Sequence, residues 1–237
     1  MRTESFRLRK NFHLGDIINF VNAVYNLAIQ EDFQAEIITR NSVITQLLNI
    51  FDYEDRIKIS IEKRKFKNRF SFSSYFDDLC IGSWCKLTLG FTSLDDIKIK
   101  KFYLPQHKLG KITKKNYLCY QLNCYSCGAF KRRLNYLEIK KVLNLFDKGN
   151  SYYISKPNTT ISLPDVKIHF ADLINQSKFL LGSSGFFGID SGMSHLAGSL
   201  GVKGDVIIQR RWYPNYVQKW YNFMYPTLKM HPRSILY

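Results

Sequence analysis

Side chains that can do chemistry are concentrated in the sequence GIDSGMSHLAGSLGV (residues 188–202). Asp190, Ser191 and Gly192 come directly before a run of small and apolar residues that predicts a helix, and His195 follows one turn later. The first turn of a helix has N–H groups without intrahelical partners and carries partial positive charge. This stretch therefore predicts an anion-binding site suited to a diphosphate, with Ser191 as an additional hydroxyl donor.

Asp190 is the residue of this motif that least suits a phosphate, because both groups are negative. We interpret it as the N-cap of the helix, or as an acceptor for the hydroxyl groups of a ribose or sugar. A purely structural interpretation also fits the motif, namely a capped helix whose histidine lies in the core.

A second candidate for phosphate binding is a cluster of cations, Lys131, Arg132 and Arg133, at the end of the loop 124–135. The loop lies between a predicted strand and a predicted helix, as the first motif does. Ligands of open parallel sheets bind beyond the carboxyl ends of the strands. We therefore expect the cations and the first motif to converge on one pyrophosphate.

Gly15 and Asp16 open a predicted helix in the segment NFHLGDIINF (11–20). A helix N-terminus favours the ionised form of a carboxylate, so Asp16 could accept a proton from a hydroxyl group. Capping of the helix alone is the alternative role. The dinucleotide signature G-x-G-x-x-G is absent from the sequence, which argues against a dehydrogenase.

Strand-like and helix-like segments alternate along the chain, which is typical of βαβ units. The first 105 residues predict strands at 4–11, 35–39, 56–61 and 85–91 and helices at 15–30 and 41–51. The pattern restarts after residue 116, with strands at 117–123, 151–155, 178–183 and 205–209 and helices at 134–146, 170–177 and from 191.

The sequence thus predicts the α/β class, with two small Rossmann-like lobes that face a cleft and contain mainly parallel sheets. We place an N-terminal lobe at 1–105, a linker at 106–116 and a C-terminal lobe at 117–220. The remaining residues, 221–237, are interpreted as a tail that could cross back to the N-terminal lobe.

The net charge of +16 is unevenly distributed along the chain. Residues 1–105 contain 16 basic and 13 acidic residues, whereas residues 106–237 contain 19 basic and 6 acidic ones. A basic half favours a partner with phosphate groups: a nucleotide, a nucleic acid or an anionic lipid headgroup. A lysine-rich, solvated surface is the alternative.

The sequence also gives expectations about compartment and metals. No apolar run approaches the roughly 18–20 residues of a membrane span, and the first 16 residues lack the apolar core of a secretory signal, so we expect a cytoplasmic protein. Cys119, Cys124 and Cys127 lie close together, but a second close pair of cysteines is missing. We therefore predict free thiols and no metal site.

In their order along the chain, these motifs resemble those of the bacterial heptosyltransferases, glycosyltransferases of the two-lobe GT-B architecture that act on lipopolysaccharide core. Gly15-Asp16 matches a Gly-Asp at the start of the first helix. The segment KRRLN (131–135) partly matches a Lys-x-Trp-Pro-like segment. DSGMSHLA (190–197) matches Asp-(Ser/Thr)-Gly-x-x-His-(Leu/Ile)-Ala in full. The similarity covers residues 12–30 and about 117–209.

The resemblance implies a function and a role for each matching residue. Asp16 would be the general base that deprotonates the acceptor, and Lys131, Ser191, Gly192 and His195 would hold the donor diphosphate, with Arg132 beside them. Such enzymes invert the anomeric centre and use a nucleotide sugar without a metal or other cofactor. The implied reaction moves a heptose or related sugar to a surface glycan of the lipopolysaccharide type.

The implied acceptor is an anionic glycan or glycolipid, and the protein would then work at the inner face of the membrane. Two alternatives remain open. Cations and aromatic residues are interleaved at 63–70 and 210–223, which is typical of single-strand nucleic-acid binding and would suit glycosylation of modified DNA. The second alternative is a non-catalytic module of degenerate GT-B fold that binds a glycan or a nucleic acid.

Overall fold

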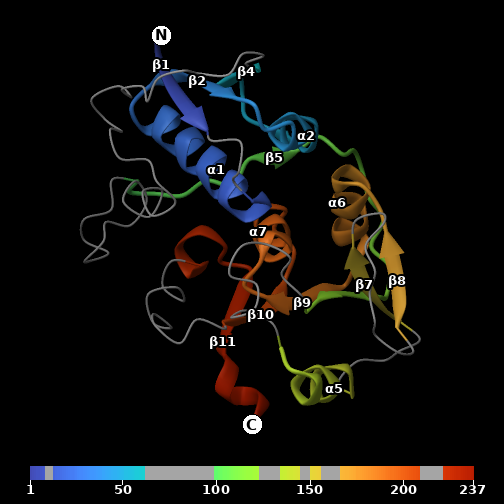
Figure 1. Ribbon diagram of the computed structural model, residues 1–237. Coiled ribbons are helices and arrows are strands. Elements are labelled where there is room, and N and C mark those ends of the chain that lie inside the picture. Colours follow the sequence, from blue (N-terminus) through green and yellow to red (C-terminus); the bar gives the residue numbers. More distant parts are fainter. Residues whose placement is uncertain (9–12, 62–98, 123–133, 145–149, 156–165, 209–220) are drawn as a thin grey trace. The chain divides into compact units, whose positions relative to one another are not determined.

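The computed structural model (Figure 1) describes residues 1–8, 13–61, 99–122, 134–144, 150–155, 166–208 and 221–237. Contacts within the chain divide it into two compact units, Met1–Lys108 and Leu109–Tyr237. The boundary falls inside the segment 106–116.

The first unit is built on a parallel sheet of three strands in the order β1-β2-β4. Burial alternates strictly along β2, which places one face of this strand in the core and matches its period of two residues. Helix α1 buries most of its circumference, as its apolar spacing predicts. The elements of the unit are β1 (Arg2–Leu8), α1 (Leu14–Gln30), β2 (Phe33–Thr39), α2 (Val43–Ile50), β3 (Phe51–Asp52), β4 (Ile57–Ile61) and β5 (Gln106–His107).

The first unit also holds the chain just before the boundary. Strand β5 pairs antiparallel with β3, and the Lys108 N–H donates to the Ile50 carbonyl at 2.7 Å. On α1, the buried Asn26 amide bonds both backbone groups of Tyr103, accepting from its N–H at 2.6 Å and donating to its carbonyl at 3.0 Å. These bonds explain why residues up to 108 belong to the first unit.

The second unit contains a six-stranded, wholly parallel sheet in the order β11-β10-β9-β6-β7-β8. All carboxyl ends of its strands therefore lie at one edge. Residues 221–224 form a further helical turn. The elements are β6 (Leu118–Gln121), α5 (Tyr136–Asn144), β7 (Ser151–Ser155), β8 (Lys167–Phe170), α6 (Leu173–Gly182), β9 (Gly185–Ile189), α7 (Gly192–Ser199), β10 (Gly204–Ile208), β11 (Leu228–Pro232) and the 3₁₀ helix η2 (Arg233–Leu236).

A buried carboxylate fixes the last residues of the chain to α5. Glu138 is 1% exposed and accepts hydrogen bonds from Arg233 Nε and Nη2 at 2.5 and 2.6 Å, from the Tyr237 hydroxyl at 2.6 Å and from the Asn135 N–H at 2.6 Å. Burial by itself raises the pKa of Glu138, but the hydrogen bonds from Arg233, Tyr237 and Asn135 outweigh it and lower the pKa to about 2. We call these four residues the Glu138 cluster.

The structure confirms the α/β class with mainly parallel sheets but corrects the predicted elements between 166 and 189. Residues 178–183 were predicted as a strand, yet α6 continues to Gly182, and Asp172 caps that helix through the Asn175 N–H at 2.8 Å. The strand is β9, in the glycine-containing stretch between the predicted strand 178–183 and the predicted helix from 191. Strand β8 was not predicted.

The assignment of 221–237 as a separate tail is also corrected. Strand β11 pairs in parallel with β10, from Gly204↔Leu228 to Ile208↔Pro232. These residues therefore form the last strand of the six-stranded sheet and contribute Leu228 and Met230 to the core.

Candidate functional site

The turn between β9 and α7 carries the residues that the sequence singled out first. Ser191, not Asp190, is the N-cap of α7, with extended backbone angles (φ −154°, ψ 172°). The Ser191 N–H donates to Ser194 Oγ at 3.0 Å, and the Ser191 side chain in turn accepts the backbone N–H of Ser194. This reciprocal pair is a capping box, so the N-cap role predicted for Asp190 belongs to its neighbour.

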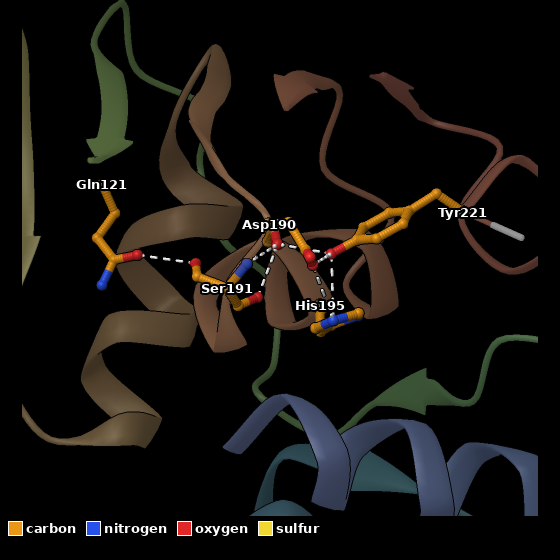
Figure 2. A network of polar contacts seen from close by, with 6 residues as sticks. Gln121, Asp190, Ser191, His195 and Tyr221 are labelled. Carbon is orange, nitrogen blue, oxygen red and sulfur yellow. Dashed lines mark hydrogen bonds and ion pairs between the residues drawn. The ribbon is translucent and has the colours of Figure 1, made fainter. Parts of the chain in front are cut away.

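Gln121 is a residue of this site that was not predicted from the sequence. It ends β6, the strand next to β9, and its Oε1 accepts the Ser191 hydroxyl at 2.8 Å (Figure 2). Because parallel strands end at the same edge, the last residue of β6 reaches the turn that follows β9. Its position near the carboxyl end of the predicted strand 117–123 was the available signal.

Asp190 lies behind this cap, with only 3% of its surface exposed. Its Oδ1 accepts the hydroxyl of Tyr221 at 2.7 Å. The hydroxyl that Asp190 accepts in this structure belongs to a side chain of the same unit, and its predicted role toward the hydroxyls of a ribose or sugar stays a prediction. Figure 2 shows the two groups directed at each other.

His195 is a core histidine in this structure, 6% exposed on the first turn of α7. Its Nε2 lies 3.1 Å from the Tyr221 hydroxyl and 3.7 Å from Asp190 Oδ1. Its ring stacks on Tyr221 with a centroid distance of 4.9 Å and meets Tyr225 edge-on at 5.7 Å. This geometry fits the structural interpretation of the motif, in which the helix is capped and its histidine lies in the core.

Cations and aromatic residues are interleaved in the segment 210–223, which contains Tyr221. In the structure, Tyr221 and Tyr225 are both completely buried. They are four residues apart, a spacing that places two rings on one face of a helical turn. Their burial leaves these two rings no exposed face on which a nucleic-acid base could stack.

Asp190, Ser194 and His195 form a network of polar contacts around the Tyr221 hydroxyl. The positions of its hydrogens follow from which atoms can only accept them. Burial and then the charge of Asp190 raise the pKa of Tyr221 well above its usual value, so the phenol keeps its hydrogen. That hydrogen is donated to Asp190, so His195 Nε2 must carry the hydrogen that points to the phenol oxygen. The Ser194 hydroxyl donates to the Ser191 carbonyl at 2.7 Å and lies 3.0 Å from the phenol oxygen.

In the first unit, Asp16 is the third residue of α1 and Gly15 the second. The Asp16 carboxylate is half-buried, and its Oδ2 accepts the backbone N–H of His13, the N-cap, at 3.4 Å. The structure thus shows the capping role. The role of Asp16 as a base stays a prediction.

Several predicted residues lie outside the described part of the chain, namely Lys131, Arg132, Arg133, the basic stretch 63–70 and four of the five cysteines. The fifth, Cys119, is a buried free thiol, and burial raises its pKa to about 12. Among the described residues, no group of three or more His, Cys, Asp or Glu side chains is arranged to hold a metal ion. Within the same residues, no helix is long and apolar enough to cross a membrane.

No protein-family model matches the sequence, and no curated protein matches it either. Solved structures do resemble it. The iron-containing dodecameric glycosyltransferase TibC from enterotoxigenic E. coli superposes with a TM-score of 0.59 over 87% of this chain, at 12% identity. A complex of the heptosyltransferase TibC with ADP-D-β-D-heptose gives 0.57 over 88%, at 10% identity. The chain spans only 58% and 60% of these two TibC chains.

Two further structures match over most of both chains. The glycosyl transferase family 9 protein from Veillonella parvula has a TM-score of 0.55 at 10% identity, with 97% of this chain and 86% of that chain covered. E. coli heptosyltransferase WaaC with ADP has a TM-score of 0.52 at 10% identity, with 98% and 91% covered. The chain therefore has the fold of heptosyltransferases and family 9 glycosyltransferases, as its motifs predict.

Proposed function

We propose that this protein is a heptosyltransferase-like glycosyltransferase, which moves a sugar from a nucleoside-diphosphate donor to a hydroxyl group of a surface glycan. The observation that carries the proposal is the capped start of α7 at the carboxyl edge of a parallel sheet, formed by the motif DSGMSHLA. The same fold is solved elsewhere with ADP and with ADP-D-β-D-heptose.

The start of α7 suits the leaving group of such a reaction. When the bond between the anomeric carbon and the diphosphate oxygen breaks, negative charge develops on the diphosphate. The N–H groups of the first helical turn, at Gly192 and Met193, offer fixed donors for that charge, and the helix dipole adds to them. Lys131 and Arg132 would supply positive charge beside them. This arrangement needs no metal.

Asp16 would serve the other substrate. Its carboxylate takes the proton of the acceptor hydroxyl while the acceptor oxygen bonds to the anomeric carbon, opposite the departing nucleoside diphosphate. This displacement inverts the anomeric centre. The excess of basic residues in 106–237, the part of the chain that contains the proposed donor site, suits the phosphates of a nucleotide sugar. The acceptor we propose is an anionic glycan or glycolipid at the cytoplasmic face of a membrane.

The test is a thermal-shift and hydrolysis screen of the full chain against a panel of nucleoside diphosphates and nucleotide sugars. A true donor nucleotide should stabilise the protein by about 2.7 kcal/mol at one hundred times its Kd. Lys131→Ala and Arg132→Ala should weaken that binding, whereas Lys140→Ala, an exposed lysine on α5, should not. Lack of stabilisation by every nucleotide would contradict the proposal.

A binding role without turnover is the second candidate, and the capping bond of Asp16 to His13 favours it. The same screen separates the two functions. Binding of a nucleotide sugar without hydrolysis, and without transfer to lipopolysaccharide-core acceptors, would establish the second candidate.

A further inference from the structure

Helix α5 and the residues that follow β11 expose apolar surface that the fold does not use. Four large apolar side chains here are each more than half exposed, two in the first turn of α5 and two after β11: Tyr136, Leu137, Ile235 and Tyr237. Among the described residues of the second unit, the only other exposed large apolar side chain is Phe170. Single exposed apolar residues are ordinary, whereas a group of them marks an interaction surface.

The two groups of exposed residues lie side by side. Figure 1 shows the C-terminal end of the chain next to α5. Glu138 on α5 accepts hydrogen bonds from Arg233 and from the Tyr237 hydroxyl. Lys141 Nζ donates to the Leu236 carbonyl at 2.8 Å and lies 5.7 Å from the centroid of the Tyr237 ring. We define the α5 face as the four exposed apolar residues together with two lysines of the helix, Lys140 and Lys141.

The α5 face lies at the same edge of the sheet as the proposed donor site. The chain reaches α5 from the carboxyl end of β6, η2 from that of β11, and α7 from that of β9. Because all six strands are parallel, these carboxyl ends share one edge. The contact of Glu138, in the first turn of α5, with Arg233, directly after β11, agrees with this placement.

The exposed charges of the α5 face are positive. Lys140 and Lys141 are both exposed, and each follows one of the exposed residues Tyr136 and Leu137 by four positions, which places it beside that side chain. Glu138 is the only acidic residue in the segments 134–144 and 221–237. It is buried against Arg233, so the Glu138 cluster removes the single negative charge from the outer surface.

An anionic lipid surface matches this combination of side chains. Lysines lay their alkyl stems along apolar groups and keep the ammonium among lipid headgroups, while the apolar side chains enter the boundary beneath. A second copy of this chain fits less well, because a two-fold interface would set the lysines of one face against those of the other. A single-stranded nucleic acid would stack on tyrosines but gains nothing from the aliphatic Leu137 and Ile235.

We propose that the α5 face docks the protein on a bilayer that contains anionic phospholipids, with the apolar side chains in the interface and the two lysines against lipid phosphates. The inference rests on the proposed function, since it names the surface through which such an enzyme would reach a glycolipid acceptor. Docking in this way turns the edge of the sheet that carries the proposed donor site toward the membrane.

Cosedimentation of the full chain with vesicles, without nucleotide, tests the docking. The parent protein should bind vesicles of phosphatidylcholine and phosphatidylglycerol, and lose most of this binding at high salt or with phosphatidylcholine alone. Leu137→Ser should weaken binding about tenfold, because it removes an apolar side chain from the interface. Lys140→Ala should weaken it about fivefold, the usual effect of one cation at an anionic surface.

Lys178→Ala is the matched control for the loss of a charge. Lys178 is an exposed lysine on α6, and Phe179 of that helix packs on Tyr152, whereas α5 packs in the cluster that contains Tyr153. Neighbouring residues of a strand point to opposite faces of a sheet, so α6 and α5 cover opposite faces. Lys178→Ala should bind vesicles as the parent does. A loss equal to that of Lys140→Ala would show only a general effect of net charge and would overturn the inference.

Leu137→Trp reports on insertion itself. An indole prefers the membrane interface, so this variant should bind vesicles more tightly than the parent. Brominated lipids should quench its fluorescence more than that of the parent protein. Quenching equal to that of the parent would show that residue 137 stays in water and would overturn the inference.

The other occupants of the face give different results. A dimer in light scattering that Leu137→Ser dissociates would assign the face to a second copy. Binding of a single-stranded oligonucleotide that is lost in Tyr136→Ala and kept in Leu137→Ser would assign it to a nucleic acid. Either result, or vesicle binding that is unchanged in both Leu137→Ser and Lys140→Ala, would overturn the inference.

Thermal shifts with nucleoside diphosphates keep this inference separate from the proposed function. Leu137→Ser and Lys140→Ala should be stabilised by the donor nucleotide as the parent is. Vesicle binding without stabilisation by any nucleotide would leave the docking surface in place and contradict the proposed function. Stabilisation by a nucleotide without vesicle binding would support the function and overturn the docking.

Discussion

The ring of Tyr225 lies directly on Gly198 of α7, so close that a Cβ at residue 198 would overlap the Cγ atom of that ring. This contact seats the segment that carries Tyr221 against the helix that begins at the proposed donor site. Glycine is needed at 198 for a packing reason rather than for a special backbone angle.

Gly198→Ala should therefore destabilise the protein by about 1–3 kcal/mol, the usual cost of excess volume in a packed core. Urea unfolding measures it. In a Tyr225→Leu background the same substitution should cost less, because the ring that it overlaps is gone, and a double-mutant cycle gives the difference. Equal costs in both backgrounds would show that Tyr225 is not the obstacle.

Asp16→Asn separates proton transfer from helix capping. Asparagine keeps the size and most of the capping ability of aspartate but cannot accept the proton. We expect turnover to fall about 10²–10⁴-fold, with nucleotide-sugar affinity and Tm nearly unchanged. Asp16→Ala should additionally cost about 1 kcal/mol of stability. Steady-state kinetics and thermal melts check both, and transfer at the parent rate by Asp16→Asn would show that Asp16 only caps α1.

Gln121→Glu tests whether the end of β6 faces the proposed diphosphate. A glutamate still accepts the Ser191 hydroxyl but introduces a negative charge. Affinity for ADP should fall by about tenfold, and by less at high salt. Gln121→Met is the uncharged control, which loses the bond to Ser191 without adding charge. A loss of affinity of the same size in both variants, independent of salt, would place the diphosphate elsewhere.

The Glu138 cluster should make the free energy of unfolding depend on pH in the acidic range. The pKa of Glu138 is lowered from 4.5 to about 2 in the folded protein, so its contribution is complete above pH 4.5 and is lost as pH falls from 4.5 to 2. The loss should amount to about 1–3 kcal/mol. Urea unfolding at pH 7 and pH 3 measures it. Glu138→Gln should lower stability at pH 7 and show a smaller loss toward pH 3, and an equally steep loss would assign the acid sensitivity to other carboxylates.

Local sequence was sufficient for much of the fold. The helical spacing of α1 and the short apolar run of β2 predict both elements within two residues. The end of α6 and the position of β9 were not predictable in this way. Phe179-Leu180-Leu181 is an apolar run that fits a strand as well as a buried helix. Glycines are common in turns, yet Gly188 lies inside β9, where a Cβ would come within 2.6 Å of the Phe186 ring.

The candidate site was predictable only in part for a similar reason. The motif at 190–195 showed where a helix begins and which side chains gather there. Its partners come from elsewhere, since Gln121 is 70 residues away from Ser191 and Tyr221 is 31 residues away from Asp190. The pairing of β6 with β9 brings Gln121 to this turn, and the helical turn before β11 brings Tyr221 there; no local sequence pattern encodes either contact.

The separation of Asp190 and Tyr221 has a consequence for protein synthesis. A ribosome adds about 5–20 residues per second, so Tyr221 follows Asp190 into the nascent chain after roughly 2–6 seconds. During that interval the Tyr221 hydroxyl cannot donate to the Asp190 carboxylate, and exposure of the carboxylate to water is more favourable than its burial. The β9–α7 turn therefore gains its buried form late, when β11 can pair with β10 and the Glu138 cluster can close. The buried form of this turn thus depends on residues 221–237, which supply Tyr221 and β11.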